Sequence, residues 1–394
     1  MATTHPRWAL VGLCMLFNLI DGLDVMAMAF TASSVAAEWG LSGAQTGLLL
    51  SAGLVGMALG SVLAAPIVAR YGRRRMLLGC LALSGTSMLL AGQAAGFDTL
   101  LCLRGLTGVG VGAILVTANV ATYEHASAQW RGLAIALQSV AFCLGAVLCG
   151  LLAQGLTDHV GWRPVFLAGG AITLAACAIA ALYYHEPHPE GGRQALRAPR
   201  YGELFRPGHW QRTARLAAVC FLLMFSFYFV MSWTPSLLVH NGFSTRNGAA
   251  GGILLNLGGM LGALLVGLGA NRFGFLQLLL ACLLVNALLM LALVPLTALP
   301  SLAALAACLA GLLLNGAVAA LYSLAAHAFA DPLRASGVGL MLATGRLGAI
   351  LSPAVAGLLL DIHWQPQALF AFFAASLVLA AGLAWHSGAR VHTA

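Results

Sequence analysis

The chain has 394 residues, of which 61% are hydrophobic and only 8% are charged, and its mean hydropathy is +0.93. This composition indicates a membrane protein and excludes a water-soluble globular domain. The net charge of +8 comes from 19 basic residues that are all arginine, and no basic patch with interleaved aromatic residues points to nucleic acid.

Long apolar stretches follow one another along the whole chain. A helix that spans a bilayer needs about 20 apolar residues, whereas outer-membrane strands would be shorter and would alternate. The first stretch is too long for a signal peptide, so we interpret it as a retained helix. The sequence therefore predicts an all-α polytopic membrane protein with twelve transmembrane helices, at 8–30, 44–69, 76–95, 99–121, 132–155, 162–184, 213–240, 248–270, 276–296, 300–328, 336–360 and 366–386.

Two carboxylates interrupt the first apolar stretch, Asp21 and Asp24. They are three residues apart, so they share one helix face. An ionisable residue at membrane depth is costly and marks a functional site by default. We expect this pair to couple transport to protons, with a permanently locked salt bridge as the alternative.

Arg104, in the fourth stretch, is the expected partner of Asp24. At a rise of 1.5 Å per residue, both residues lie about 8–9 Å from the outer ends of their predicted helices. Opposite charges at equal depth on neighbouring helices should pair. The alternative to a coupling role is a static architectural ion pair.

The arginines are distributed unevenly between the two sides of the predicted topology. With the N-terminus inside, fifteen of them fall on the cytoplasmic side, only Arg163 and Arg246 fall outside, and two lie within helices. This bias follows the positive-inside rule. It predicts an inner-membrane protein with both termini in the cytoplasm.

The chain also repeats itself. Arg70-Tyr71-Gly72 follows the second stretch, and Arg272-Phe273-Gly274 follows the eighth, at the same point of a six-helix unit. The longest polar stretch, rich in proline and arginine, separates the units. We therefore predict an N-terminal half at 1–184, a cytoplasmic linker at 185–212 and a C-terminal half at 213–394. Two six-helix repeats are typical of alternating-access transporters.

Arg104-Gly105-Leu106-Thr107-Gly108-Val109-Gly110-Val111-Gly112 reads R-x-x-x-G-x-G-x-G. In this motif, and over its whole length, the chain resembles the major facilitator superfamily. Strings similar to those of its aromatic acid:proton symporter group are Asp21-Gly22-Leu23-Asp24, Trp233-Thr234-Pro235, Arg334-Ala335-Ser336-Gly337-Val338-Gly339, Gly345-Arg346-Leu347-Gly348-Ala349 and Ser352-Pro353. The chain departs from the superfamily at Ala69, where an aspartate normally precedes the first arginine of the loop.

Candidate substrate contacts lie at depth in several stretches. Arg346 offers a planar fork that matches a carboxylate, so we expect it to anchor a substrate carboxylate. The alternative is pairing with Asp21 or with helix carbonyls. Tyr228 and Trp233 combine an aromatic ring with a donor, which suits a hydroxylated ring, although such aromatics more often pack or face lipid. Three further polar groups could satisfy a ring hydroxyl or one another, Gln138, Asn256 and Tyr322.

A third group of charged or polar residues flanks the predicted cytoplasmic loops. We expect them to form gate contacts, the alternative being a basic cluster that only sets topology and attracts anionic lipid. They are Arg70, Arg73, Arg74, Glu124, Arg131, Asn271, Arg272 and Arg334.

These patterns predict a proton symporter that imports a small aromatic carboxylate, such as a hydroxybenzoate or phenylpropanoate. We expect its partners to be that substrate, protons and the lipid bilayer, and we expect a monomer with no cofactor and no metal. No phosphate-binding loop, nucleophile–base arrangement or metal-ligand cluster indicates an ATPase or an enzyme. The alternatives are proton-coupled efflux of drugs or metabolites, and an aromatic-acid sensor of the same fold that does not transport.

Overall fold

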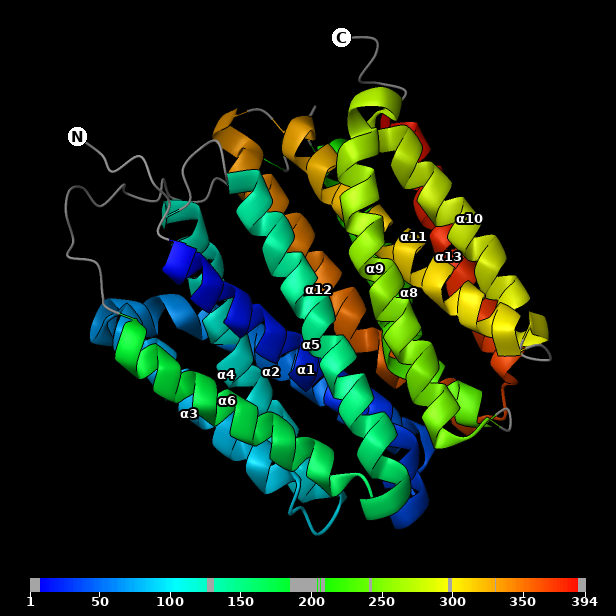
Figure 1. The fold of residues 1–394 in the computed structure, drawn as a ribbon. Coiled ribbons are helices and arrows are strands. Elements are labelled where there is room, and N and C mark those ends of the chain that lie inside the picture. The colour runs from blue at the N-terminus through cyan, green and yellow to red at the C-terminus, as the bar shows by residue number, and fades with distance from the viewer. Residues whose placement is uncertain are drawn as a thin grey trace. The chain divides into compact units, whose positions relative to one another are not determined.

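The structure, a computed structural model, describes residues 8–125, 131–184, 204, 206, 210–240, 243–296, 300–329 and 331–388. These residues form twelve helices (Figure 1). They are α1 (Trp8–Trp39), α2 (Gly43–Tyr71), α3 (Arg73–Ala91), α4 (Phe97–His125), α5 (Arg131–Val160), α6 (Arg163–Tyr183), α8 (Trp210–His240), α9 (Thr245–Phe273), α10 (Phe275–Leu296), α11 (Pro300–Ala328), α12 (Asp331–Asp361) and α13 (Pro366–Gly388). The predicted all-α fold with twelve helices is confirmed.

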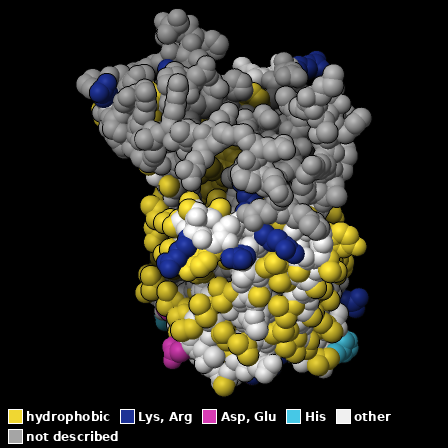
Figure 2. All heavy atoms as spheres, turned by 90° about the vertical axis from the view of Figure 1, so that its left-hand side faces the viewer, with side chains coloured by type: hydrophobic (Ala, Val, Ile, Leu, Met, Phe, Trp, Pro, Cys, Tyr) yellow, Lys and Arg dark blue, Asp and Glu magenta, His cyan; other side chains and the backbone are white. Residues whose placement is uncertain are grey.

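Eleven of these helices are long and apolar enough to cross a membrane. The exception is α3, whose first three residues are Arg73, Arg74 and Arg75 and whose second half carries serine and threonine. On the face shown in Figure 2, hydrophobic side chains cover much of the described surface, several basic side chains lie in a row across it, and others lie apart from that row. A face of this kind suits contact with lipid chains bordered by a polar interface.

The chain divides into two compact units. Unit 1 contains residues up to Glu186 together with Met231–Leu257 and Pro353–Asp361, and unit 2 contains the remaining residues. Unit 1 therefore holds α1 to α6 and one end each of α8, α9 and α12. The division of the sequence into 1–184, 185–212 and 213–394 stays a prediction.

In unit 1, α2 and α4 pack backbone against backbone. A Cβ atom at Gly56 would lie 2.1 Å from the carbonyl oxygen of Gly105, and one at Gly60 would lie 2.0 Å from that of Val109. Neither position has room for a side chain, so the glycines allow the two helices to approach this closely.

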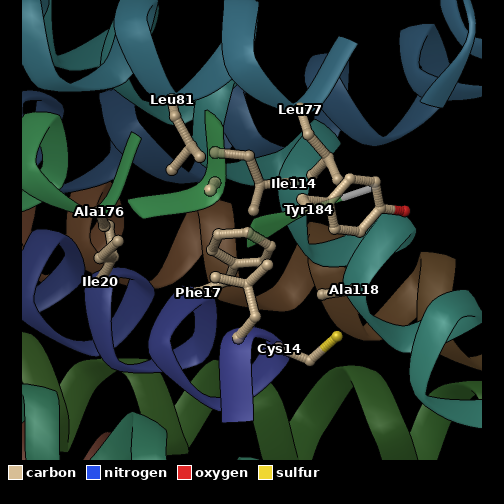
Figure 3. Packing of buried hydrophobic residues seen from close by; sticks show 11 residues of the cluster. Cys14, Phe17, Ile20, Leu77, Leu81, Ile114, Ala118, Ala176 and Tyr184 are labelled. Carbon is tan, nitrogen blue, oxygen red and sulfur yellow. The ribbon is translucent and has the colours of Figure 1, made fainter. Parts of the chain in front are cut away.

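A hydrophobic cluster in unit 1 joins four helices, α1, α3, α4 and α6. Phe17 and Ile20 of α1 meet Leu77 and Leu81 of α3, Ile114 of α4, and Ala176 at the α6 side (Figure 3). Every one of these side chains is at most 2% exposed. Close packing of this kind fixes the orientation of α1 and therefore of the carboxylates that α1 carries.

Unit 2 contains a second glycine-mediated pair, between α9 and α11. A Cβ atom at Gly258 would lie 1.8 Å from the carbonyl oxygen of Cys308, and one at Gly262 would lie 2.0 Å from that of Leu312. The spacing of four residues repeats that of Gly56 and Gly60. The two helix pairs are thus corresponding parts of the two halves.

The turn that follows α2 and the turn that follows α9 also have the same geometry. The guanidinium of Arg70 lies 5.3 Å from the centre of the Tyr71 ring, and that of Arg272 lies 5.5 Å from the centre of the Phe273 ring. The next residue is glycine in both turns, with φ of 84° at Gly72 and 78° at Gly274. Only glycine adopts this backbone region without strain. The predicted six-helix repeat is therefore seen in both packing and turn geometry.

Several helix ends differ from the predicted boundaries, and the largest difference is at the end of α1. The predicted helices 8–30 and 44–69 leave the stretch 31–43 as a connection, but α1 continues to Trp39. Its alanines favour helix, and its last turn is held by tertiary contacts. Glu38 accepts hydrogen bonds from the indole of Trp162 at 2.7 Å and from Arg163 at 2.9 Å, and the Trp39 ring packs edge-on against Trp162.

Candidate functional site

A buried ion pair connects α1 and α4 in unit 1. Arg104 Nη1 lies 2.5 Å from Asp24 Oδ1, and Arg104 Nη2 donates to the backbone oxygen of Asp24 at 3.1 Å. The side chains are 2% and 1% exposed. The predicted contact between these two residues is therefore present, because equal depth on neighbouring helices brings the charges together.

The pair is incompletely satisfied. Asp24 Oδ2 and Arg104 Nε are buried and have no hydrogen-bond partner. A buried carboxylate oxygen without a partner is costly while the group is charged. That cost falls when the free oxygen takes a proton, so Asp24 has the geometry of a group that can hold one.

The surroundings of Arg104 show how the sequence makes room for it. A Cβ atom at Gly53 of α2 would lie 2.9 Å from Arg104 Nη2, so glycine leaves space for the guanidinium. The guanidinium carbon lies 6.0 Å from the centre of the Phe166 ring of α6, at the limit of a cation–π contact. Cys149 of α5 is also buried.

Four other residues predicted for proton coupling or substrate binding belong to unit 1, and all are buried: Asp21, Gln138, Trp233 and Asn256. The indole of Trp233 donates to the carbonyl oxygen of Pro353 at 3.1 Å, so in this conformation its donor is used within the protein. The amide of Asn256 donates to Gly252 at 2.9 Å, and its Oδ1 is buried without a hydrogen-bond partner. Asn256 therefore offers an acceptor.

In unit 2, three predicted substrate residues lie on three different helices, within electrostatic range of one another. Tyr322 of α11 interacts electrostatically with Arg346 of α12 and Tyr228 of α8. A guanidinium and two phenols within electrostatic range combine a cation for an anionic group with aromatic surface and hydroxyl groups. This combination is chemically suited to an aromatic acid.

The two halves share backbone contacts between helices but do not share their buried charged residues. A Cβ atom at Gly145 would lie 1.9 Å from the carbonyl oxygen of Leu19, and one at Gly348 would lie 2.3 Å from that of Phe221, so these two contacts correspond. Counting five residues on from Leu19 and from Phe221 gives Asp24 in one half and Ser226 in the other.

The same comparison applies to the two arginines. Gly105 of α4, which contacts α2, corresponds to Cys308 of α11, which contacts α9. The residue before each is Arg104 in one half and Ala307 in the other. In the same way, Arg346 lies two residues before Gly348, and the residue two before Gly145 is Cys143. The same helix packing thus forms in the other half without these charges. The fold does not require them, which favours a functional role.

The residues predicted to form a cytoplasmic gate are only partly described. Arg70 and Arg272 are exposed beside their aromatic neighbours, and Arg74 donates to the carbonyl oxygen of Ala181 at 2.6 Å, which is a contact between α3 and α6. Arg73, at the start of α3, is half-buried. The side chains of Glu124, Arg131, Asn271 and Arg334 lie outside the described residues.

Sequence reasoning missed two acidic residues, Glu38 and Asp361. Glu38 ties the end of α1 to the start of α6, and Asp361 accepts hydrogen bonds from the backbone of α2. A capping box of Ser42 and Gln45 marks the start of α2 in the sequence, but no sequence pattern indicates that Asp361 contacts it.

Across the described part of the chain, no group of three or more His, Cys, Asp or Glu residues forms a metal-ligand cluster.

Two repeats of membrane-spanning helices with buried charges are the architecture of many membrane transporters. Residues 14–306 match the profile of the Major Facilitator Superfamily, and the chain belongs to that family. It is a multi-pass, membrane-embedded protein, and the family and its relatives are transporters rather than enzymes, as the sequence predicted.

Two curated relatives match almost the whole chain. The 3-(3-hydroxy-phenyl)propionate transporter of Escherichia coli is 32% identical, over 95% of this chain and 92% of the relative. The 4-hydroxybenzoate transporter PcaK of Pseudomonas aeruginosa is 31% identical, over 97% and 94%. The predicted resemblance to aromatic acid transporters is confirmed.

The fold also matches a solved structure. The crystal structure of a bacterial homolog to the human lysosomal transporter Spinster, in an inward-facing and occupied conformation, superposes with a TM-score of 0.83. The match covers 98% of both chains at 19% sequence identity, so it supports the fold alone.

Proposed function

We propose that this protein imports a small aromatic carboxylate together with protons, by alternating access across the cytoplasmic membrane. The buried Asp24–Arg104 pair, in which one carboxylate oxygen has no partner, is the observation that carries the proposal. A transporter that uses a proton gradient needs a buried group that can take up a proton and release it.

The substrate class comes from the relatives. Both transport molecules whose names specify a benzene ring, a hydroxyl group and a carboxylate. The Arg346, Tyr228 and Tyr322 group has a complementary chemistry, with a cation for the carboxylate and phenols for the ring and its hydroxyl. Arg346 is the proposed anchor, and Asn256, Gln138 and Trp233 are proposed to line the path.

The cycle follows from these parts. Protonation of Asp24 weakens its attraction to Arg104, while the substrate anion is held by Arg346. The two halves then move around the bound substrate, and the proton and the acid leave on the cytoplasmic side. Asp21, one helical turn before Asp24, is proposed to assist the proton step. The arginines at the inner ends of α2, α3 and α9 are proposed to form the cytoplasmic gate.

The decisive experiment is uptake of radiolabelled 4-hydroxybenzoate and 3-(3-hydroxyphenyl)propionate into proteoliposomes, with and without an inward proton gradient. Accumulation above the external concentration that collapses with a protonophore would support proton symport. Uptake that requires the opposite gradient would support export. Saturable binding of either acid without flux would support a sensor that does not transport.

A further inference from the structure

One acidic residue at the end of α12 contacts the start of α2, 318 positions away in the sequence. Asp361 Oδ1 accepts from the backbone nitrogen of Gly43 at 2.6 Å, and Asp361 Oδ2 accepts from that of Ala44 at 2.9 Å. Asp361, Gly43 and Ala44 all belong to unit 1. The contact therefore joins a helix of the C-terminal half to a helix of the N-terminal half within one compact unit.

This carboxylate completes the cap of α2. The first four backbone N–H groups of a helix have no partner within the helix. At α2, Gln45 accepts from the nitrogen of Ser42 and Ser42 accepts from that of Gln45, at 3.0 Å and 3.3 Å. Asp361 accepts the two hydrogen bonds in between, so four consecutive backbone donors from Ser42 to Gln45 are satisfied.

The charge of Asp361 is complementary to α2 and not to its own helix. A negative charge is favourable at a helix N-terminus and unfavourable at a C-terminus. The first turn of α2 contains no acidic residue, whereas Asp361 is the last residue of α12, a helix with no basic residue in its last turn. The favourable placement of this charge therefore depends on contact between the two helices.

Small residues bring the same helix ends together. A Cβ atom at Gly357 would lie 2.1 Å from the carbonyl oxygen of Gly43, and one at Gly47 would lie 2.4 Å from that of Pro353. The two glycines of α2 are four residues apart, as are Pro353 and Gly357 of α12. This spacing allows close helix contact in membranes, and Asp361 lies one turn beyond it.

The first turns of α9 make comparable contacts in unit 1. A Cβ atom at Gly252 of α9 would lie 2.3 Å from the Phe30 ring of α1, and Gln154 of α5 donates to the carbonyl oxygen of Arg246 at 3.3 Å. In the predicted topology all these segments lie toward the outer side. The first half is thus in contact with two helices of the second half at this side, α9 and α12.

We propose that Asp361 is a gating residue, which holds the outer ends of α12 and α2 together when the transporter is closed to the outside and releases α2 when it opens. This inference rests on the alternating-access mechanism proposed above. Because Asp361 is exposed, the contact is screened by solvent and can be broken at modest cost. A reversible gate requires a contact of this kind.

Hydrogen–deuterium exchange of the full-length protein in lipid nanodiscs tests the proposal without substrate or a proton gradient. The variants are Asp361→Ala, which removes both acceptors, and Asp361→Asn, which keeps one acceptor without the charge. Asp98→Asn is the matched control, since Asp98 is an exposed acidic residue in the first turn of α4. Peptides that cover 42–48, 231–240, 245–257 and 353–361 report on the gate, and a peptide from 77–91 reports on a helix outside it.

We expect exchange in all four gate peptides to rise together, about five- to tenfold for Asp361→Ala and less for Asp361→Asn, because opening exposes these segments as one unit. The 77–91 peptide and the Asp98→Asn protein should match wild type. A rise confined to 42–48 would show a simple helix cap and would overturn the gate, as would unchanged exchange. If the acids are not transported but the four peptides respond together, the gate stands and the proposed function fails.

Discussion

Asp24 and Arg104 are joined by one short contact, 2.5 Å between Oδ1 and Nη1, while the other carboxylate oxygen, Oδ2, has no hydrogen-bond partner. Both side chains are almost fully buried. A bidentate pair would satisfy both oxygens. The geometry therefore combines a fixed position for the carboxylate with one oxygen that remains available for a proton.

Neutralising this carboxylate should separate proton coupling from substrate movement. In Asp24→Asn the amide keeps nearly the same size but carries no charge and does not titrate. We expect accumulation driven by a proton gradient to fall to the level of protein-free liposomes, while exchange of labelled for unlabelled acid continues. The control is Asp98→Asn, which removes an exposed carboxylate. Undiminished accumulation by Asp24→Asn would exclude Asp24 as the proton carrier.

The same pair should also affect stability, in a way that a double variant reveals. Removing one partner of a buried ion pair costs about 3–5 kcal/mol because the other charge is left alone. We expect Arg104→Gln to lower the thermal unfolding temperature in detergent markedly. Asp24→Asn combined with Arg104→Gln should recover much of that loss, since no charge remains buried. Additive losses in the double variant would show that the two side chains act independently.

Arg346 should distinguish acids from their amides. A hydrogen bond to a charged group contributes about 1.5–3 kcal/mol, and each 1.4 kcal/mol is a factor of ten. We therefore expect Arg346→Ala to weaken binding of 4-hydroxybenzoate by about 10- to 100-fold, with a smaller effect on 4-hydroxybenzamide. Competition binding on purified protein measures both ligands.

Two further variants test whether the effect of Arg346→Ala comes from the planar guanidinium at this position. Arg346→Lys keeps the charge but not the planar fork, so it should give an intermediate affinity for the acid. Arg246→Ala removes an exposed arginine at the start of α9 and should leave both affinities unchanged. Equal losses for acid and amide in Arg346→Ala would remove Arg346 from the role of carboxylate anchor.

The glycine contacts predict a sharp difference between two conservative substitutions. Gly60→Ala would place a methyl group 2.0 Å from the carbonyl oxygen of Val109, whereas a Cβ atom at Gly79 of α3 would meet nothing within 4 Å. Forcing extra volume into a packed site costs about 1–3 kcal/mol. We expect Gly60→Ala to lower the unfolding temperature and Gly79→Ala to leave it unchanged or slightly raised. Equal temperatures for both variants would contradict the backbone packing of α2 on α4.

Much of the fold could be predicted from the sequence because the thickness of the lipid bilayer fixes the apolar length of each spanning helix. Apolar length predicted the number of helices, and the spacing of Asp24 and Arg104 from their helix ends predicted their contact. The extension of α1 to Trp39 was missed because the contacts of Glu38 with Trp162 and Arg163 stabilise a mixed sequence that has no apolar signal.

The candidate site was harder to predict wherever the partner lies far away in the sequence. The indole donor of Trp233 makes it a candidate substrate contact in the sequence, but in the structure that donor is used by the carbonyl oxygen of Pro353. Asp361 was missed because its partners are backbone N–H groups, which have no sequence signature. Hydropathy and residue type locate charges in depth, whereas only the three-dimensional packing shows which groups meet.

The backbone contacts at Gly56, Gly60, Gly258 and Gly262 affect how a mutational survey of this protein should be interpreted. None of these positions tolerates even a methyl group, so a scan for lost transport will rank them beside Asp24 and Arg346. Their loss would reflect failed assembly rather than failed chemistry. Measuring the amount of folded protein for each variant alongside its transport rate would separate the two groups of positions.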